Sequence, residues 1–257
     1  MNSDVRKDGA GELRVFATTR WSLILSAAKS ESGEQTARDA LAELCRIYWR
    51  PIFSVACQRG RSKEDAQDLT QDFFLMILDL NWLEHADPHR GRFRSFLLKS
   101  LQNFLINAAE KSRARKRGGD VEFISWDDWM GDAPSRLSIS AQALDSLPPE
   151  RLFDFHWATT VAEQALRRLR EECEGKYRLR LFYALSPHLT EDRDEISYTD
   201  LAARLGVPET AVKKQLHTMR QRYRSLLRDE VAHTVASPAD VEDEIRYLCA
   251  ALAARTE

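Results

Sequence analysis

Residues 198–217 read YTDLAARLGVPETAVKKQLH, and this stretch decides how the fold is interpreted. The spacing of the apolar residues indicates two helices, each with one apolar side: Leu201 lies in the first, and Val212 and Leu216 lie in the second. Gly206 can take the left-handed conformation that ends a first helix, so that a second helix starts after the following turn. The stretch therefore predicts a helix-turn-helix, a motif whose second helix enters the major groove of DNA.

The second helix of this motif carries polar and basic residues on the side opposite its apolar residues. We expect the following to contact DNA: Thr210, Lys213, Lys214, His217 and Arg220. An ordinary pair of antiparallel helices fits the apolar spacing equally well, but it leaves the exposed basic residues unexplained. Pro208 precedes the helix, so its first backbone N–H groups are expected to lack a side-chain acceptor.

Helical periodicity extends through most of the 257 residues, of which 43% are hydrophobic. Helices are predicted at 36–59, 62–77, 93–115, 152–169, 177–185, 198–205, 209–228 and 241–252, with a short one after Thr18 and Thr19. Pro51 is expected to kink or split the first long helix. Glycine (10) and proline (8) are too sparse for a turn-rich β fold. The predicted class is all-α.

The charges are distributed unevenly along a chain whose net charge is −2. Residues 90–117 hold nine basic residues and one acidic residue, and residues 204–228 hold seven and one. A single charged run is usually a solvated face. Two basic helices in an otherwise acidic chain favour a polyanionic partner that is touched in two places.

The sequence offers little support for catalysis or for a bound cofactor. No phosphate-binding glycine loop is present, and neither a metal site nor a catalytic triad can be assembled from its histidines, acids and serines. The cysteines Cys45, Cys57, Cys173 and Cys249 form no CxxC pair and are expected to be buried, reduced thiols. The start of the chain lacks the apolar core of a signal peptide, and no stretch is apolar enough to span a membrane. We expect a cytoplasmic protein that is not an enzyme.

Three segments together resemble bacterial RNA polymerase sigma factors of the extracytoplasmic-function group. Residues 65–74 read DAQDLTQDFF, close to the family pattern DAEDLVQEVF, and residues 91–107 read GRFRSFLLKSLQNFLIN, like the basic, aromatic helix that follows in these factors. The helix-turn-helix is then similar to the family's region 4. The phrases TTRWS at 18–22 and LF at 152–153 resemble a longer subgroup that has a linker and a C-terminal extension.

The resemblance implies a sigma factor that directs RNA polymerase to promoters. The β′ clamp helices of core polymerase would be bound by Asp65, Asp68, Leu69, Gln71, Asp72 and Phe73. The minus-ten promoter element would be bound and melted by Arg92, Arg94, Lys99, Asn103, Lys111, Arg113 and Arg115, and the helix-turn-helix would bind a minus-thirty-five element. Phe93, Phe96 and Phe104 could stack on bases, but their regular spacing favours the core. An anti-sigma protein is an open candidate as a further partner.

Two other functions remain open at this point. A helix-turn-helix regulator that binds operator DNA without polymerase would account for residues 197–228 but not for 62–117. A protein that inhibits or scaffolds a basic partner would use the acidic surface. Binding to core polymerase distinguishes all three.

The expected organisation has five parts. They are an N-terminal extension with a short helix (1–35), a region 2-like domain (36–117), an acidic linker (118–151), a region 4-like domain (152–230) and an amphipathic C-terminal helix (231–257). The acidity of the linker and of the C-terminal segment suggests the hypothesis that one of them shields a basic helix until polymerase binds.

Overall fold

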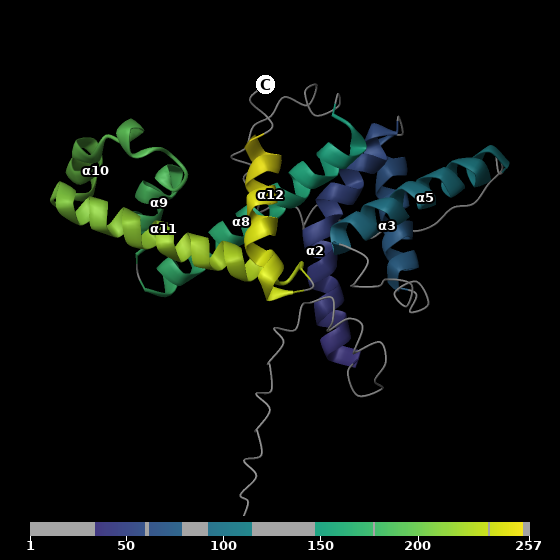
Figure 1. Ribbon diagram of the computed structural model, residues 1–257, viewed down its shortest axis with the longest axis horizontal. Coiled ribbons are helices and arrows are strands. Elements are labelled where there is room, and N and C mark those ends of the chain that lie inside the picture. The colour runs from purple at the N-terminus through teal and green to yellow at the C-terminus, as the bar shows by residue number, and fades with distance from the viewer. Residues whose placement is uncertain are drawn as a thin grey trace, which may run out of the picture.

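The computed structural model describes residues 34–59, 62–78, 92–114, 147–176, 178–235 and 237–253. Within these ranges all regular secondary structure is helical, which confirms the all-α class (Figure 1). No helix there has the length and apolar character that a bilayer span requires. The short helix predicted near Thr18 and most of the acidic linker lie outside the described residues.

The elements follow the predicted order. The α-helices of the described ranges are α2 (Glu34–Gln58), α3 (Lys63–Leu78), α5 (Phe93–Ala114), α8 (Pro149–Gly175), α9 (Leu179–Leu185), α10 (Tyr198–Leu205), α11 (Glu209–Ala232) and α12 (Val241–Ala253). Short 3₁₀ helices join some of them: η3 (Ser186–His188), η4 (Arg193–Glu195) and η5 (Pro238–Asp240).

Helix α2 contains a proline but is not interrupted by it. The helix continues through Pro51, so the expectation that this proline splits it is wrong. A proline removes one backbone hydrogen bond from a helix. The neighbouring Ile52 and Val55 are fully buried, and this burial offsets the loss.

The predicted start and stop signals are confirmed at two helices. The Ser62 hydroxyl accepts a hydrogen bond from the backbone N–H of Asp65 at 3.0 Å and so caps α3. Gly206 has φ 72°, the left-handed conformation expected at the end of α10, and its backbone N–H bonds to the Ala202 carbonyl. The helix-turn-helix therefore forms as predicted, although α11 extends to Ala232 instead of ending at Arg228.

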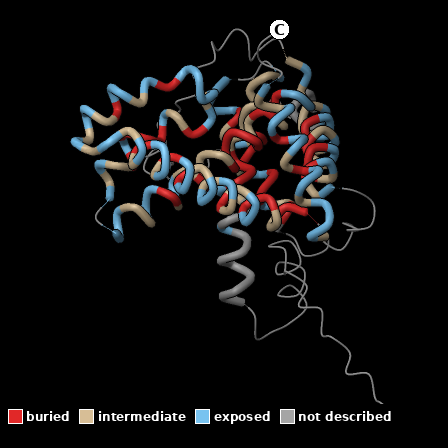
Figure 2. Tube along the Cα trace, turned by 60° about the vertical axis from the view of Figure 1, so that its left-hand side comes forward, coloured by how far each residue is buried: buried red, intermediate tan, exposed pale blue. Residues whose placement is uncertain are grey.

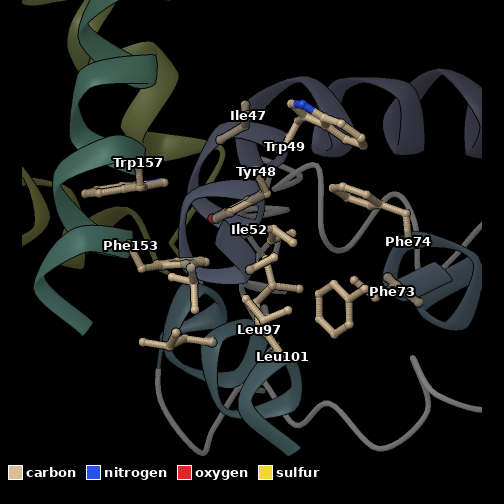
Figure 3. Packing of buried hydrophobic residues seen from close by; sticks show 14 of the residues in the cluster. Ile47, Tyr48, Trp49, Ile52, Phe73, Phe74, Leu97, Leu101, Phe153 and Trp157 are labelled. Carbon is tan, nitrogen blue, oxygen red and sulfur yellow. The ribbon is translucent and has the colours of Figure 1, made fainter. Parts of the chain in front are cut away.

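The first hydrophobic cluster unites the early helices with the first part of α8. Ile52 of α2, Phe73 of α3 and Leu101 of α5 are fully enclosed in it. Figure 3 shows Phe153 and Trp157 of α8 pointing into this cluster, and both side chains are fully buried. The bundle of α2, α3 and α5 is thus completed by a helix that follows more than 30 residues later in the sequence.

A second cluster holds the helix-turn-helix and lies at the other end of the same long helix. Its buried residues include Ala165 and Leu169 of α8 and Val212 and Leu216 of α11. The last part of α11 returns to the first cluster through Val231. Figure 2 shows buried residues concentrated in the bundle and continuing along the long helices. Because α8 and α11 serve both clusters, the domain boundaries drawn from the sequence stay predictions.

Candidate nucleic-acid interface

The first half of α11 presents a polar and basic surface. Val212 and Leu216 are buried in the second cluster, so the opposite side of the helix faces solvent. Four of the predicted DNA-contacting residues are exposed there: Thr210, Lys213, Lys214 and His217. Lys213 lies 5.0 Å from the centre of the Tyr198 ring and 3.5 Å from the Glu209 carboxylate. These contacts are exposed and weak, so they leave the lysine available to a stronger anion.

The start of α11 has the features expected from Pro208. No side chain caps the helix, while the Pro208 carbonyl accepts hydrogen bonds from the backbone N–H groups of Ala211 and Val212. Thr199 of α10 donates a 2.8 Å hydrogen bond to the Glu209 carboxylate. This bond ties the two helices of the motif together at the end that carries the exposed lysines.

Arg220 occupies a different environment from the other predicted residues of α11. Its guanidinium donates hydrogen bonds to the backbone carbonyls of His188 at 2.8 Å and Glu191 at 2.5 Å, and the side chain is half-buried. Arg204 similarly donates to the Ala184 carbonyl at 3.0 Å. Arg220 thus holds the segment between α9 and α10, and Arg204 ties α10 to the end of α9, so part of the positive charge of the motif serves the fold.

The second basic segment begins at the N-terminal end of α5. Lys99 and Asn103 are exposed one helical turn apart and share one side of the helix. Phe93, Phe96 and Phe104 are partly buried against the first cluster, as their spacing favours. The side chains of Lys111 and Arg113, and the whole of Arg115, lie outside the described part of the chain.

Arg94 is buried at this end of α5. Its Nε donates to Glu244 of α12 at 2.7 Å, and its Nη1 pairs with Asp154 of α8. The guanidinium carbon lies 3.9 Å from the centre of the Tyr247 ring and 5.0 Å from that of Trp157. Burial alone would lower the pKa of Arg94, but the two carboxylates raise the pKa above its ordinary value.

Arg92 shares the same carboxylate but stays partly exposed. Its Nε lies 2.9 Å from the second oxygen of Glu244, and its side chain is 42% exposed. An open pocket of about 450 Å³ adjoins it between α5, α8 and α12. The pocket is lined by Arg92, Arg94, Ser95, Leu98, Lys99, Gln102, Glu150, Asp154 and Tyr247. In the described structure, therefore, carboxylates of the same chain lie next to the cations predicted to bind DNA.

The predicted partner-binding residues of α3 separate into exposed and buried groups. Asp65, Asp68 and Asp72 are exposed. The pKa of Asp68 is raised, mainly because the carboxyl group is partly shielded from water and also because the charges of Asp72 and Asp65 repel its own. Gln71 and Leu69 are half-buried, and Leu69 packs against the first cluster. Phe73 is fully buried, so it does not face a partner in this conformation.

The apolar residue on the acidic side of α3 is Leu75, which sequence reasoning missed. It is 65% exposed, the highest value among the large hydrophobic residues that the structure describes as exposed. It follows Asp68 by seven positions and Asp72 by three, which is the spacing of one helix face. That spacing is the signal that could have identified it.

Two comparisons with known proteins connect α3 and α5 to one protein family. Residues 44–115 match the family model for sigma-70 region 2, a range that contains α3 and α5. The ECF RNA polymerase sigma factor SigE of Mycolicibacterium smegmatis is 25% identical over 213 residues, which cover 80% of this chain and 68% of the relative.

Together these two matches support an extracytoplasmic-function sigma factor. The resemblance drawn from residues 65–74 and 91–107 is thereby confirmed, and with it a function in transcription initiation. The match also shows that the acidic surface of α3 and the basic helix α5 of this sigma factor belong to one family domain, region 2.

Among the described residues no group of histidines, cysteines and acids could hold a metal ion. The four cysteines are free thiols, and burial raises the pKa of Cys45 to about 12. Cys249 is exposed and the other three cysteines are half-buried, which corrects the expectation that all four are buried.

Proposed function

We propose that this sigma factor binds core RNA polymerase through α3 and promoter DNA through α5 and α11. The region 2-like part (36–117) would contact polymerase and the minus-ten element, and the region 4-like part (152–230) would contact the minus-thirty-five element. The work is done by binding, without covalent chemistry, and it takes place in the cytoplasm. The observation that carries the proposal is the exposed carboxylate surface of α3 within the matched region 2.

The contact with polymerase is proposed to combine charge with one apolar anchor. Asp65, Asp68 and Asp72 supply three exposed carboxylates that suit a basic partner helix. Leu75 supplies the apolar side chain beside them, in place of Phe73, because Phe73 could reach a partner only if the core opened. Gln71 and Leu69 lie at the border of this surface.

The contacts with DNA are proposed to differ at the two promoter elements. On α11, Lys213, Lys214 and His217 would enter the major groove of duplex DNA, and Thr210 would lie nearest the helix start. On α5, Lys99 would bind the backbone of a melted strand while Asn103 reads a base. Arg92 would join Lys99 through its exposed part.

The test is assembly with core polymerase followed by run-off transcription. The purified chain should co-elute with core enzyme at one to one and should make initiation at a suitable promoter depend on its addition. A chain that binds duplex DNA but never associates with core enzyme would instead be a helix-turn-helix regulator. A chain that binds neither would favour the role of an acidic interaction protein.

A residue-level test separates the α3 surface from general acidity. The triple variant Asp65→Asn, Asp68→Asn and Asp72→Asn should lower affinity for core enzyme at least tenfold. A matched control removes three exposed carboxylates from another place, at Asp192, Asp194 and Glu195. Equal losses in both variants would exclude a specific docking surface on α3. Leu75→Ser should weaken assembly without lowering the melting temperature.

A further inference from the structure

In Figure 1, helix α12 lies between the helix-turn-helix and the bundle of α2, α3 and α5, and it packs against α8 and α11. Its Glu244 pairs with Arg92 and Arg94 at the start of α5. Two residues earlier in α12, Glu242 pairs with Arg228 of α11, with Nε and Oε1 2.6 Å apart. A single acidic helix therefore spans the two segments that carry the excess positive charge of the chain.

The contact at α5 is built more firmly than the contact at α11. The side chains of Glu244 and Arg94 are 2% and 6% exposed, whereas those of Glu242 and Arg228 are 61% and 50% exposed. A carboxylate buried to this degree requires close cationic partners, since removing it from water is costly. Glu244 has two of them, and Asp154 supplies the second negative charge that Arg94 faces.

The carboxylate and the aromatic ring that α12 brings to the arginines resemble the phosphate and the base of a nucleotide. An arginine binds a carboxylate and a phosphate with the same planar set of N–H donors. The Tyr247 ring lies over both guanidinium groups, 3.9 Å from Arg94 and 5.1 Å from Arg92, as a stacked base would. Tyr247 also donates a hydrogen bond to Asp154, which fixes the ring over the arginines.

We propose that α12 is an intramolecular competitor of the melted DNA strand, and that it covers Arg94 of α5 and pairs with the preceding Arg92 until the strand displaces it. The proposal rests on the proposed function, because it describes the regulation of the same basic surface. The open pocket beside Arg92 and Lys99 gives the phosphate backbone a place to begin the exchange. Displacement of α12 must also withdraw Leu248 from the first cluster, which costs free energy because apolar surface is exposed to water. Without DNA, therefore, α12 stays in place.

The alternative is a permanent strut, in which α12 holds α5 in the shape that DNA requires. The two models predict opposite effects of weakening the contact. Release of a competitor raises the affinity for single-stranded DNA, whereas loss of a strut lowers it.

The experiment compares full-length variants that remove the same charge from α12. Glu244→Gln removes the buried carboxylate, and Asp243→Asn removes an exposed one that pairs with Arg246 of the same helix. Affinity for a fluorescent, mixed-sequence single strand of roughly 12 nucleotides is measured by anisotropy at fixed salt. We expect Glu244→Gln to bind at least threefold more tightly than Asp243→Asn, and the latter to match the unaltered chain. Equal or weaker binding by Glu244→Gln overturns the proposal.

A second variant covers the case in which Glu244→Gln fails to fold. Tyr247→Ala truncates a side chain that is 36% exposed and lies outside the hydrophobic clusters, so the apolar core is left intact. It should also raise the affinity for the strand. Hydrogen exchange gives an independent readout: amides of residues 241–253 should exchange faster when the oligonucleotide is bound. Unchanged or slower exchange overturns the proposal.

These outcomes are separable from those of the proposed function. If the unaltered chain never activates run-off transcription but the strand still releases α12, the function fails and the competition stands. If transcription depends on the chain while the variants of Glu244 and Tyr247 bind the strand as the unaltered chain does, the competition fails alone.

Discussion

The two basic helices of this molecule hold their positive charges in opposite ways. On α11, Lys213 and Lys214 are exposed, and Arg220, nearly two turns later, binds backbone carbonyls. On α5 the order is reversed: Arg94, near the helix start, is buried among carboxylates, while Lys99 further along is exposed. A count of basic residues therefore measures the charge of a helix without saying which charges a ligand can reach.

The difference follows from what surrounds each helix. The start of α5 faces α8 and α12, both of which bring carboxylates to it. The start of α11 faces outward, with only its apolar side packed against the rest of the motif. Guanidinium groups suit enclosed sites because they make several directed hydrogen bonds at once, whereas lysines suit exposed sites.

The largest expected effect tests the buried charge on α5. Arg94→Ala should lower the free energy of unfolding by about 3–5 kcal/mol, because it leaves Glu244 and Asp154 without their shared partner. Lys99→Ala, an exposed cation on the same helix, should change it by no more than about 0.5 kcal/mol. Urea unfolding followed by circular dichroism measures both. A similar, small loss in the two variants would remove the contrast between covered and exposed charge.

The next effect tests the structural cation of α11. Arg220→Ala should cost about 1–3 kcal/mol of stability, because the carbonyls of His188 and Glu191 lose a charged donor. Arg224→Ala removes an exposed arginine four residues later and serves as the control, with a change within about 0.5 kcal/mol. Should Arg224 prove the costlier residue, Arg220 would not hold the segment between α9 and α10.

The exposed lysines should matter for binding and not for stability. If Lys213 and Lys214 contact phosphates, the double alanine variant weakens binding to all duplexes, and the slope of log K against log salt falls by about 2. If either lysine reads a base, about 1–3 kcal/mol is lost selectively at one position. Lys176→Ala, at the exposed end of α8, should leave the slope unchanged. Equal affinity for all duplexes at fixed salt would count against base readout.

The smallest effect concerns the helix that supports α11. The Ser197 hydroxyl caps α10 and also donates to the Asp200 carboxylate at 2.8 Å. Ser197→Ala should therefore cost about 1 kcal/mol. The exposed Thr190→Ala should be neutral within about 0.5 kcal/mol, and thermal unfolding distinguishes the two. A neutral Ser197→Ala would mean that packing against α11 alone fixes α10.

Local signals in the sequence were sufficient for most of the fold. Gly206 and Ser62 mark helix ends through their own backbone and side-chain chemistry, so they could be placed without knowledge of distant residues. The acidic surface of α3 was likewise predictable from its spacing. The split at Pro51 does not occur, because burial around this proline depends on α8, which lies far away in the sequence.

The candidate site was predictable in composition but not in accessibility. Glu244 lies 150 positions from Arg94, and no periodicity relates residues at that distance. Phe73 and Leu75 are two positions apart on one helix, yet one is fully buried and the other 65% exposed. A helical pattern gives their relative orientation, but only the packing of α3 against α2 and α5 shows which side is covered.

The shared helix α8 has a practical consequence for any attempt to divide this protein. A fragment ending before residue 147 would keep α2, α3 and α5 but would lose Phe153 and Trp157, leaving Tyr48 and its apolar neighbours facing water. Such a fragment should self-associate or precipitate. One that ends after Gly175 retains this covering and is the shorter piece worth expressing.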